Sequence, residues 1–207
     1  FVLVRADGSP LYTLAVAVDD VLMKVTHVLR GEDLLSSTPR QIRVYQAMGV
    51  KEADYPLFAH LPFVMGADNA KLSKRNGETS IAWYREQGFL PEALCNYLAL
   101  LGWSPGDDRE NLTLAELTEL FTIERVNSNP ARFDMKKLEN INGDKIRALT
   151  LNDFYNWSLP FLQRAKVVST PISSEQERVV RLALPIIQER LIKLSEVPAM
   201  LAFFFTE

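Results

Sequence analysis

Residues 26–33 read THVLRGED, and TPRQ follows at residues 38–41. The apolar start of the first stretch predicts a strand over Thr26–Leu29, and its charged end predicts a turn beyond the C-terminus of that strand. The second stretch has threonine and glutamine at the spacing of a capping box, with proline in the first turn, so it predicts a helix that ends at Gly49. Strand, charged turn and capped helix follow one another in this way in nucleotide-binding α/β domains, where ligands bind beyond the strand C-termini.

The rest of the chain divides into a β-rich start and a helical remainder. Phe1–Arg5 and Tyr12–Val18 are rich in β-forming residues, and the turn sequence DGSP between them predicts a hairpin. Leu57–Val64 is the last apolar run, and from about Thr150 onward no strand pattern remains. Caps, prolines and glycines predict helices over Ser80–Gln87, Pro91–Leu101, Thr113–Phe121, Asp134–Asn142, a long segment capped by Ser173 and Gln176 and kinked at Pro185, and a last helix opened by Pro198. The fold class is therefore α/β followed by all-α.

Composition and charge exclude several classes of protein. The 207 residues are 47% hydrophobic and 24% charged, which is typical of globular domains, and the net charge of −3 argues against a generally basic nucleic-acid coat. No apolar run approaches the roughly 20 residues that span a bilayer, so we expect no membrane association and a cytoplasmic location. The single cysteine, Cys95, excludes an internal disulfide and a multi-cysteine zinc site, and we expect it to be buried.

A second informative stretch lies at residues 71–75, which read KLSKR and are followed by Asn-Gly. Two lysines around a serine, in a loop with permissive turn residues, suit the binding of a triphosphate whose charge redistributes during reaction. By themselves these residues leave a solvated surface turn as the alternative.

Six phrases in this order resemble bacterial glutamyl-tRNA synthetase, a class I aminoacyl-tRNA synthetase. They are DGSPLY at 7–12, VDD at 18–20, THVLRGED at 26–33, KLSKR at 71–75, NYLALLGW at 96–103 and NPARFD at 129–134. The resemblance is strong over about residues 1–150. It implies that residues 1–56 are the second half of a Rossmann-type nucleotide-binding domain. Residues 57–149 would then be a mostly helical stem-contact region with the KMSKS-like loop, and 150–207 the start of a helical anticodon-binding domain.

The family's other signature, HIGH, is absent from this sequence. Only His27 and His60 occur, neither of them in such a motif, and we expect both to serve structural hydrogen bonds. We therefore expect the chain to be the C-terminal part of a larger enzyme, and expect these residues alone to make no adenylate.

The resemblance implies a reaction in which a carboxylate attacks the α-phosphate of ATP, with Mg²⁺ as the usual companion of the nucleotide and no evident zinc. The acyl group of the adenylate then passes to tRNA. Lys71 and Lys74 become the catalytic residues, because they are placed to stabilise charge on the reacting phosphates. The ATP-binding residues implied by the resemblance are Asp33, Val64, Lys71, Leu72, Ser73, Lys74 and Arg75.

The resemblance also implies a site for L-glutamate. Arg30 is the specificity candidate, since a planar guanidinium binds a carboxylate through two parallel charge-assisted hydrogen bonds. A structural Arg–Asp pair is its alternative. Tyr12 would be a second contact to the amino acid, with a core aromatic residue as the alternative. Val16, one turn of strand further, would line the pocket.

Basic residues near the predicted helix at 134–142 are candidates for contacts with the backbone of tRNA(Glu). They are Arg132, Lys136 and Lys137, with Lys145 and Arg147 close by. A solvated helix face explains them equally well. The aromatic residues Trp83, Tyr97 and Trp103 sit at core-like helical positions, and we expect them to pack inside the protein. We expect the full-length enzyme to be monomeric.

Two rival functions stay open at this point. One is a glutamyl-queuosine-type relative that modifies a nucleotide of the tRNA, but such relatives lack the helical domain that residues 150–207 begin. The other is a non-catalytic tRNA-binding module derived from a synthetase, against which the intact lysine loop argues. The sequence leaves open whether tRNA(Gln) is also charged.

Overall fold

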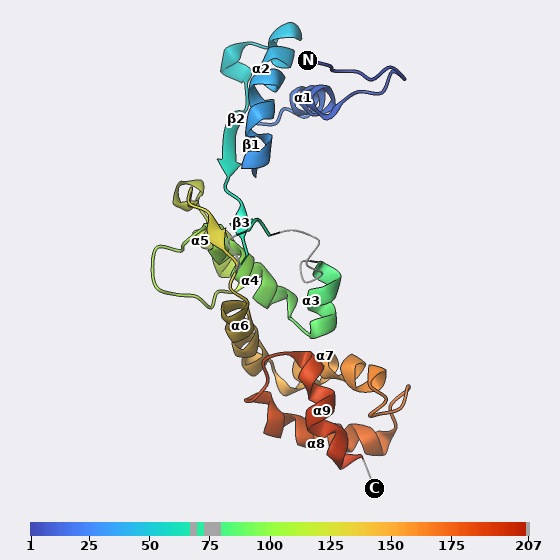
Figure 1. Ribbon diagram of the computed structural model, residues 1–207. Coiled ribbons are helices and arrows are strands. Elements are labelled where there is room, and N and C mark those ends of the chain that lie inside the picture. Colours follow the sequence, from blue (N-terminus) through green and yellow to red (C-terminus); the bar gives the residue numbers. More distant parts are fainter. Residues whose placement is uncertain (67–69, 73–79, 206–207) are drawn as a thin grey trace. The chain divides into compact units, whose positions relative to one another are not determined.

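The structure is a computed structural model that describes residues 1–66, 70–72 and 80–205. The chain divides into two compact units, Phe1–Phe63 and Val64–Glu207. The three-part division after residues 56 and 149 stays a prediction. Figure 1 shows the helices and strands of both units.

Two parallel strands and two helices build the first unit. Strand β1 (His27–Gly31) pairs with β2 (Leu57–Leu61), and helix α2 (Thr38–Ala47) lies between them in the chain. The expected order of strand, turn and helix is therefore confirmed, because a parallel pair requires a crossover of this kind. The register places Arg30 of β1 opposite His60 of β2.

The capping box expected for α2 is wrong. A 3₁₀ helix, η1 (Glu32–Ser37), runs directly into α2, so Ser37 at the N-cap already has helical dihedral angles of φ −81° and ψ −27°. The amide of Thr38 donates to the carbonyl of Leu35 inside this continuous turn. The side chains of Thr38 and Gln41 make no cap and instead contact Arg30.

Helix α1 (Tyr12–Leu22) replaces the second strand of the expected hairpin. Only a short antiparallel bridge between Val4 and Pro10 remains of that hairpin. The alternating β-branched residues of this segment imitate a strand, but Leu14, Ala17 and Val21 also recur at helical spacing and face the core of the unit. Packing against α2 therefore decides the conformation over local β-propensity.

The second unit is mostly helical, as expected. Two short parallel strands, β3 (Val64–Met65) and β4 (Ala131–Arg132), pair with each other. The helices are α3 (Ile81–Gln87), α4 (Pro91–Gly102), α5 (Leu114–Leu120), α6 (Met135–Ala148), α7 (Leu151–Arg164), α8 (Ser174–Gln188) and α9 (Val197–Leu201). One hydrophobic cluster joins α3, α4 and α6 to the last three helices; its fully buried members include Leu90, Tyr97, Leu138, Phe154 and Leu184.

Several local predictions are confirmed in this unit. The capping boxes that begin α5 and α8 are present, with Thr113 and Glu116 in the first and Ser173 and Gln176 in the second. Pro198 lies in the first turn of α9. Helix α8 continues past its internal proline to Gln188.

The sequence predicted that helix α6 ends before Gly143. The helix instead runs through Gly143 to Ala148. A Cβ atom at Gly143 would lie 3.3 Å from the carbonyl oxygen of Leu191 and 3.2 Å from Nη1 of Arg147. The glycine therefore permits a close approach of two backbone segments and does not terminate the helix. The end of α6 is held instead by Gln188, whose buried amide donates to the carbonyl of Ile146 at 2.9 Å.

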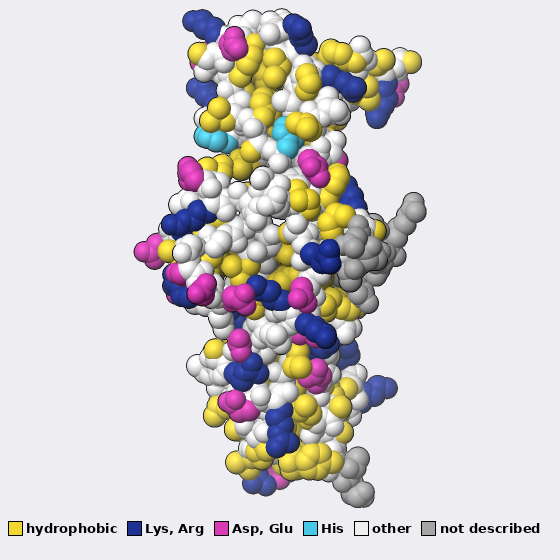
Figure 2. Space-filling view, turned by 60° about the vertical axis from the view of Figure 1, so that its left-hand side comes forward, with side chains coloured by type: hydrophobic (Ala, Val, Ile, Leu, Met, Phe, Trp, Pro, Cys, Tyr) yellow, Lys and Arg dark blue, Asp and Glu magenta, His cyan; other side chains and the backbone are white. Residues whose placement is uncertain are grey.

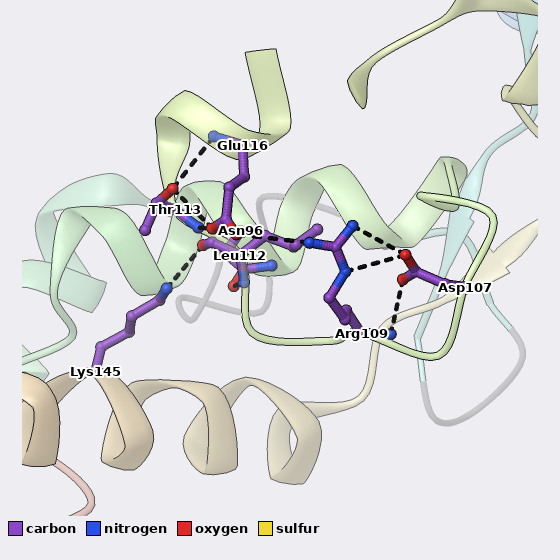
Figure 3. A network of polar contacts seen from close by, with 7 residues as sticks. All are labelled: Asn96, Asp107, Arg109, Leu112, Thr113, Glu116 and Lys145. Atoms are coloured by element: carbon purple, nitrogen blue, oxygen red, sulfur yellow. Dashed lines mark hydrogen bonds and ion pairs between the residues drawn. The ribbon is translucent and has the colours of Figure 1, made fainter. Parts of the chain in front are cut away.

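A polar network fixes the loop between α4 and α5 (Figure 3). The side-chain oxygen of Asn96 accepts from the amide of Leu112 at 2.8 Å, and the ammonium group of Lys145 donates to the carbonyl of the same Leu112 at 2.7 Å. Arg109 lies 3.6 Å from the carboxylate of Glu116. The backbone N–H and C=O groups of Leu112 thereby tie the loop to α4 and α6, and the side chain of Arg109 ties it to α5.

The aromatic residues behave as expected and the cysteine does not. Tyr97 and Trp103 are buried, and Trp83 packs against the core. Burial raises the pKa of Tyr97 to about 12. Cys95 is exposed, because α4 turns the face that carries Ala93 and Tyr97 inward. None of the described helices is long and apolar enough to span a membrane.

Candidate functional site

Arg30 lies near the C-terminal end of β1, in the first unit, and its side chain is half-buried. One terminal nitrogen, Nη2, donates to Oγ1 of Thr38 at 2.8 Å and to Oε1 of Gln41 at 2.7 Å. A third, longer contact of 3.4 Å reaches the carbonyl of Leu34. Both hydrogens of Nη2 are therefore used by the two side chains at the start of α2.

The other two nitrogens of Arg30 have weaker contacts. Nη1 donates to the hydroxyl of Tyr12 at 3.3 Å, and Nε donates to Nε2 of His60 at 3.4 Å. The guanidinium carbon lies 5.6 Å from the centroid of the Phe58 ring, within cation–π range. One hydrogen of Nη1 has no acceptor among the described residues, so Nη1 is the nitrogen best able to bind a further group.

Every hydrogen-bond partner of Arg30 is electrically neutral. Among the residues that the structure describes, no Asp or Glu side chain forms an ion pair with it. The carboxylate of Asp20 in the same unit accepts a hydrogen bond of 2.9 Å from the hydroxyl of Tyr45. A half-buried cation without an anionic partner is energetically unfavourable by itself, and an anionic ligand would offset that cost. The structural Arg–Asp pair is thus not what these contacts show.

The amide group of Gln41 is oriented by Arg30. A guanidinium can only donate hydrogen bonds, so the amide oxygen must face it and the amide nitrogen must point away. That nitrogen is buried and has no hydrogen-bond partner among the described residues. A buried donor left unpaired costs about 1–3 kcal/mol. Gln41 is fully buried, so solvent does not relieve this cost.

His60 completes the contacts around the guanidinium. Its Nε2 lies 3.0 Å from Oγ1 of Thr38, which already accepts from Arg30. Nε of Arg30 can only donate, so Nε2 of His60 must be the unprotonated nitrogen that accepts from it, and Nδ1 carries the hydrogen. In the same strand pair, Nδ1 of His27 lies 2.9 Å from the hydroxyl of Thr26. Structural hydrogen bonds for both histidines are therefore confirmed.

Tyr12 contacts Arg30 from a helix and not from the expected strand. Tyr12 and Val16 lie one turn apart on the same face of α1, where a strand was expected. Val16 is half-buried. Asp33 lies in η1 and is exposed, with its carboxylate folded over Gly31: a Cβ on that glycine would lie 2.5 Å from Oδ1 of Asp33.

The residues expected on the nucleotide side, other than Asp33, belong to the second unit. The amide of Leu72 donates to the carbonyl of Val64 at 2.9 Å, and Met65 and Lys71 form an antiparallel bridge. The start of the lysine loop is thus held by backbone hydrogen bonds to β3. Lys71 is exposed. Ser73, Lys74 and Arg75 lie outside the described residues.

An apolar cavity of about 170 Å³ receives the start of this loop. Leu72 and Val64 line it together with Ile81, Tyr84, Leu94, Leu98, Leu101 and Phe133. Successive side chains of an extended segment point to opposite sides. The burial of Leu72 in this cavity therefore turns Lys71 toward solvent.

Two of the five basic residues near α6 pair with acidic neighbours. The ammonium group of Lys137 lies 2.5 Å from Glu110, and Arg147 lies 2.5 Å from Asp144. Lys and Arg side chains alternate with Asp and Glu side chains on the face drawn in Figure 2. Arg132 and Lys136 are exposed. Among the described residues, no group of His, Cys, Asp and Glu side chains is placed to hold a metal ion.

Thr38, Gln41 and His60 are the residues of this cluster that the sequence did not reveal. The spacing of Thr38 and Gln41 is compatible with a capping box and also with two side chains that accept from the same arginine nitrogen. From the sequence, only the capping box was expected. His60 meets Arg30 through the register of two strands that α2 separates in the chain. No pattern in the sequence sets that register.

Comparisons with known proteins show which family the chain belongs to. The family model for class I tRNA synthetases (E and Q), catalytic domain, matches residues 1–140. The chain is 54% identical over its whole length to a glutamate–tRNA ligase of Clavibacter sepedonicus and 52% identical to that of Clavibacter michiganensis. It covers 41% of the length of each of these relatives.

Solved structures show the same relationship. The crystal structure of a glutamate tRNA ligase from Elizabethkingia meningosepticum, in complex with its amino acid, superposes with a TM-score of 0.83 at 32% identity. It covers 99% of this chain, which in turn covers 42% of that one. Glutamate-tRNA synthetase from Elizabethkingia anophelis gives a TM-score of 0.85, also at 32% identity. The family model matches well over half of the sequence, and so the chain belongs to the class I tRNA synthetases of the E and Q group.

Proposed function

We propose that the chain is part of a glutamate–tRNA ligase, which activates L-glutamate with ATP to glutamyl-adenylate and transfers the glutamyl group to tRNA(Glu). The observation that carries this proposal is the half-buried guanidinium of Arg30, whose partners are all neutral. A cation kept without a counter-ion selects a substrate that brings its own negative charge. Glutamate brings a side-chain carboxylate and glutamine does not.

The contacts of Arg30 indicate how the carboxylate would be bound. Both hydrogens of Nη2 are used by Thr38 and Gln41, so the substrate oxygen approaches Nη1, beside the hydroxyl of Tyr12. The sequence led us to expect two parallel hydrogen bonds from the guanidinium to the carboxylate, whereas this arrangement leaves Nη1 as the main donor. Val16, one turn along α1, would form an apolar wall next to it.

The nucleotide side of the reaction is assigned by the family resemblance and supported by the anchoring of the loop. Lys71 and Lys74 would stabilise charge on the phosphates of ATP, which brings Mg²⁺ with it as a co-substrate. Val64 and Leu72 face an apolar cavity, so their proposed part in ATP binding is through backbone atoms and through holding the loop. Asp33, Ser73 and Arg75 complete the proposed ATP-binding set.

The remaining assignments concern the larger protein. Residues 1–56 would be the second half of a Rossmann-type domain, 57–149 a stem-contact region and 150–207 the start of an anticodon-binding domain. The exposed Arg132 and Lys136, with Lys137, would contact tRNA(Glu). The helices that follow residue 150 favour the ligase over a glutamyl-queuosine-type relative. We propose a monomeric enzyme of the cytoplasm.

The test is Arg30→Ala in the full-length enzyme, assayed by aminoacylation over a range of glutamate concentrations. Removing the guanidinium leaves the substrate carboxylate without its partner, so kcat/KM for glutamate should fall by the equivalent of about 2–5 kcal/mol. Arg30→Lys should not restore activity, because one ammonium group cannot hold Thr38, Gln41 and the substrate together.

Arg43→Ala is the matched control. Arg43 is an exposed arginine of α2 that donates to Gln46 at 3.0 Å. Its removal should leave kcat/KM within about twofold of the unmodified enzyme, as is usual for an exposed side chain. Unchanged kinetics for glutamate in Arg30→Ala would remove Arg30 from the substrate site and the proposal with it.

A further inference from the structure

We propose that Gln41 is a specificity-determining residue: its neutral amide holds Arg30 in place without cancelling the charge that selects an acidic substrate. The inference rests on the proposed function, since it assumes that Arg30 binds the glutamate carboxylate. It assigns a role to a residue of α2 that the family resemblance did not single out.

The geometry of Gln41 fits positioning and not substrate contact. Its side chain is fully buried, and its Oε1 accepts from Nη2 of Arg30 at 2.7 Å. Thr38, one turn earlier on the same helix, accepts from the same nitrogen at 2.8 Å. Two acceptors on one helix thus fix Nη2, and the rigid plane of the guanidinium then sets the direction of Nη1 toward Tyr12.

Glutamate at position 41 would cancel the charge that the amide leaves in place. A carboxylate of the same length would accept the same hydrogen bond and would pair with the charge of Arg30. Its second oxygen would take the place of Nε2, which has no partner among the described residues, so neither residue satisfies that position. The difference between the two residues is that the amide keeps the guanidinium net positive.

The same reasoning explains the remaining partners of Arg30. Thr38, His60 and Tyr12 are hydrogen-bonding residues without a negative charge, and His60 accepts through an unprotonated nitrogen. An arginine surrounded in this way is held by hydrogen bonds and has no ion pair. Its charge stays available to a carboxylate that arrives from outside.

The decisive variant is Gln41→Glu in the full-length enzyme. A glutamate at this position neutralises Arg30 and repels the substrate carboxylate, so KM for glutamate should rise on the order of 10- to 100-fold. KM for ATP should stay within about threefold, since the change is confined to the amino-acid side. The melting temperature should stay close to that of the unmodified protein, because the ion pair with Arg30 offsets the cost of a second carboxylate oxygen in the unpaired place of Nε2.

Two further variants separate charge from structure. Gln46→Glu makes the same substitution on an exposed face of the same helix, where the side chain also accepts from an arginine, Arg43, at 3.0 Å. It should leave KM for glutamate within about twofold. Gln41→Met removes the acceptor and adds no charge, so it should raise KM for glutamate by less than Gln41→Glu does.

A merely structural role for Gln41 predicts the opposite pattern, in which Gln41→Glu and Gln41→Met lower the melting temperature and activity together. An unchanged KM for glutamate in Gln41→Glu would also overturn the inference. Arg30→Ala, assayed in parallel, tells the two proposals apart. If Arg30→Ala raises KM and Gln41→Glu does not, only the role of Gln41 fails; if neither does, the proposed substrate site fails as well.

Discussion

The side-chain oxygen of Asn142 accepts a hydrogen bond of 2.8 Å from the backbone amide of Leu90, which lies 52 residues earlier in the chain. The amide nitrogen of the same side chain donates to the carbonyl of Ile192 at 2.6 Å. Asn142 is fully buried in α6. One side chain therefore joins the segment before α4 to the segment that leads into α9.

Asn142→Ala should destabilise the protein by about 2–4 kcal/mol, because it leaves a buried N–H group and a buried carbonyl without partners. Urea unfolding followed by circular dichroism measures this change. Asn156→Ala, at an exposed position of α7, is the control and should change stability by no more than about 0.5 kcal/mol. Equal stability of the two variants would show that Asn142 does not hold these segments together.

Gly88→Ala should be more damaging than an ordinary glycine substitution. Gly88 has a φ of +83°, and a Cβ there would lie 2.5 Å from the backbone nitrogen of Ser195. Gly49 has a φ of +76° with open space around it, so Gly49→Ala measures the dihedral penalty alone, about 1–2 kcal/mol. Thermal unfolding should show a clearly larger loss for Gly88→Ala; a similar loss in both would mean that the backbone at Ser195 yields easily.

The capping box of α5 should make stability depend on pH in the acid range. Hydrogen bonds from the backbone and hydroxyl of Thr113 hold the pKa of the Glu116 carboxyl below its ordinary value of 4.5. A lowered pKa in the folded state means that this contribution is present above the unfolded pKa and is lost as the pH falls through the folded pKa. The stability advantage of the unmodified protein over Glu116→Gln should therefore persist near pH 7 and shrink below about pH 4.5.

The measurement for Glu116 is the urea midpoint of both proteins from pH 3 to pH 7. Glu119→Gln, at an exposed position of the same helix, controls for the change in net charge. A difference between Glu116→Gln and the unmodified protein that stays constant over this range would contradict the assignment.

If Lys74 has the proposed role, Lys74→Ala in the full-length enzyme should slow adenylate formation by roughly 100- to 1000-fold, because the charge proposed to stabilise the reacting phosphates is lost. KM for glutamate should change little. Pyrophosphate exchange in the presence of tRNA(Glu) measures the effect, with the exposed Lys51→Ala as control. A pyrophosphate-exchange rate of the variant within a few-fold of the unmodified rate would contradict the catalytic role of this lysine.

The sequence predicted best where the signal is local. Caps, prolines and helix spacing located α3, α4, α5, α8, α9 and the start of α6, because these signals rest on contacts between residues a few positions apart; they did not locate α7. The order of strand, turn and helix that contains β1 and α2 was also predicted, whereas the pairing of β1 with β2 came from the structure. Motifs with several residues in fixed order identified Arg30 and Tyr12, which the structure brings into contact.

Three predictions were wrong for one reason: the local sequence fits two structures, and contacts with distant residues decide between them. Segment 12–22 alternates like a strand but packs as a helix on α2. Gly143 was expected to end a helix, but it lies inside α6 and lets the backbone of Leu191 approach closely. Gln41 has the spacing of a capping residue, yet it is used by Arg30, and only the assembled fold could reveal that.

The close contact at Gly88 limits how the parts of this chain can be exchanged. The carbonyl of Gly88 accepts from the amide of Leu194 at 3.1 Å, and the space for a side chain there is filled by the backbone of Leu194 and Ser195. The helices after residue 150 are therefore not an interchangeable module. A chimera that takes them from a relative must bring the same backbone path past Gly88, or α3, the first helix after the lysine loop, loses its support.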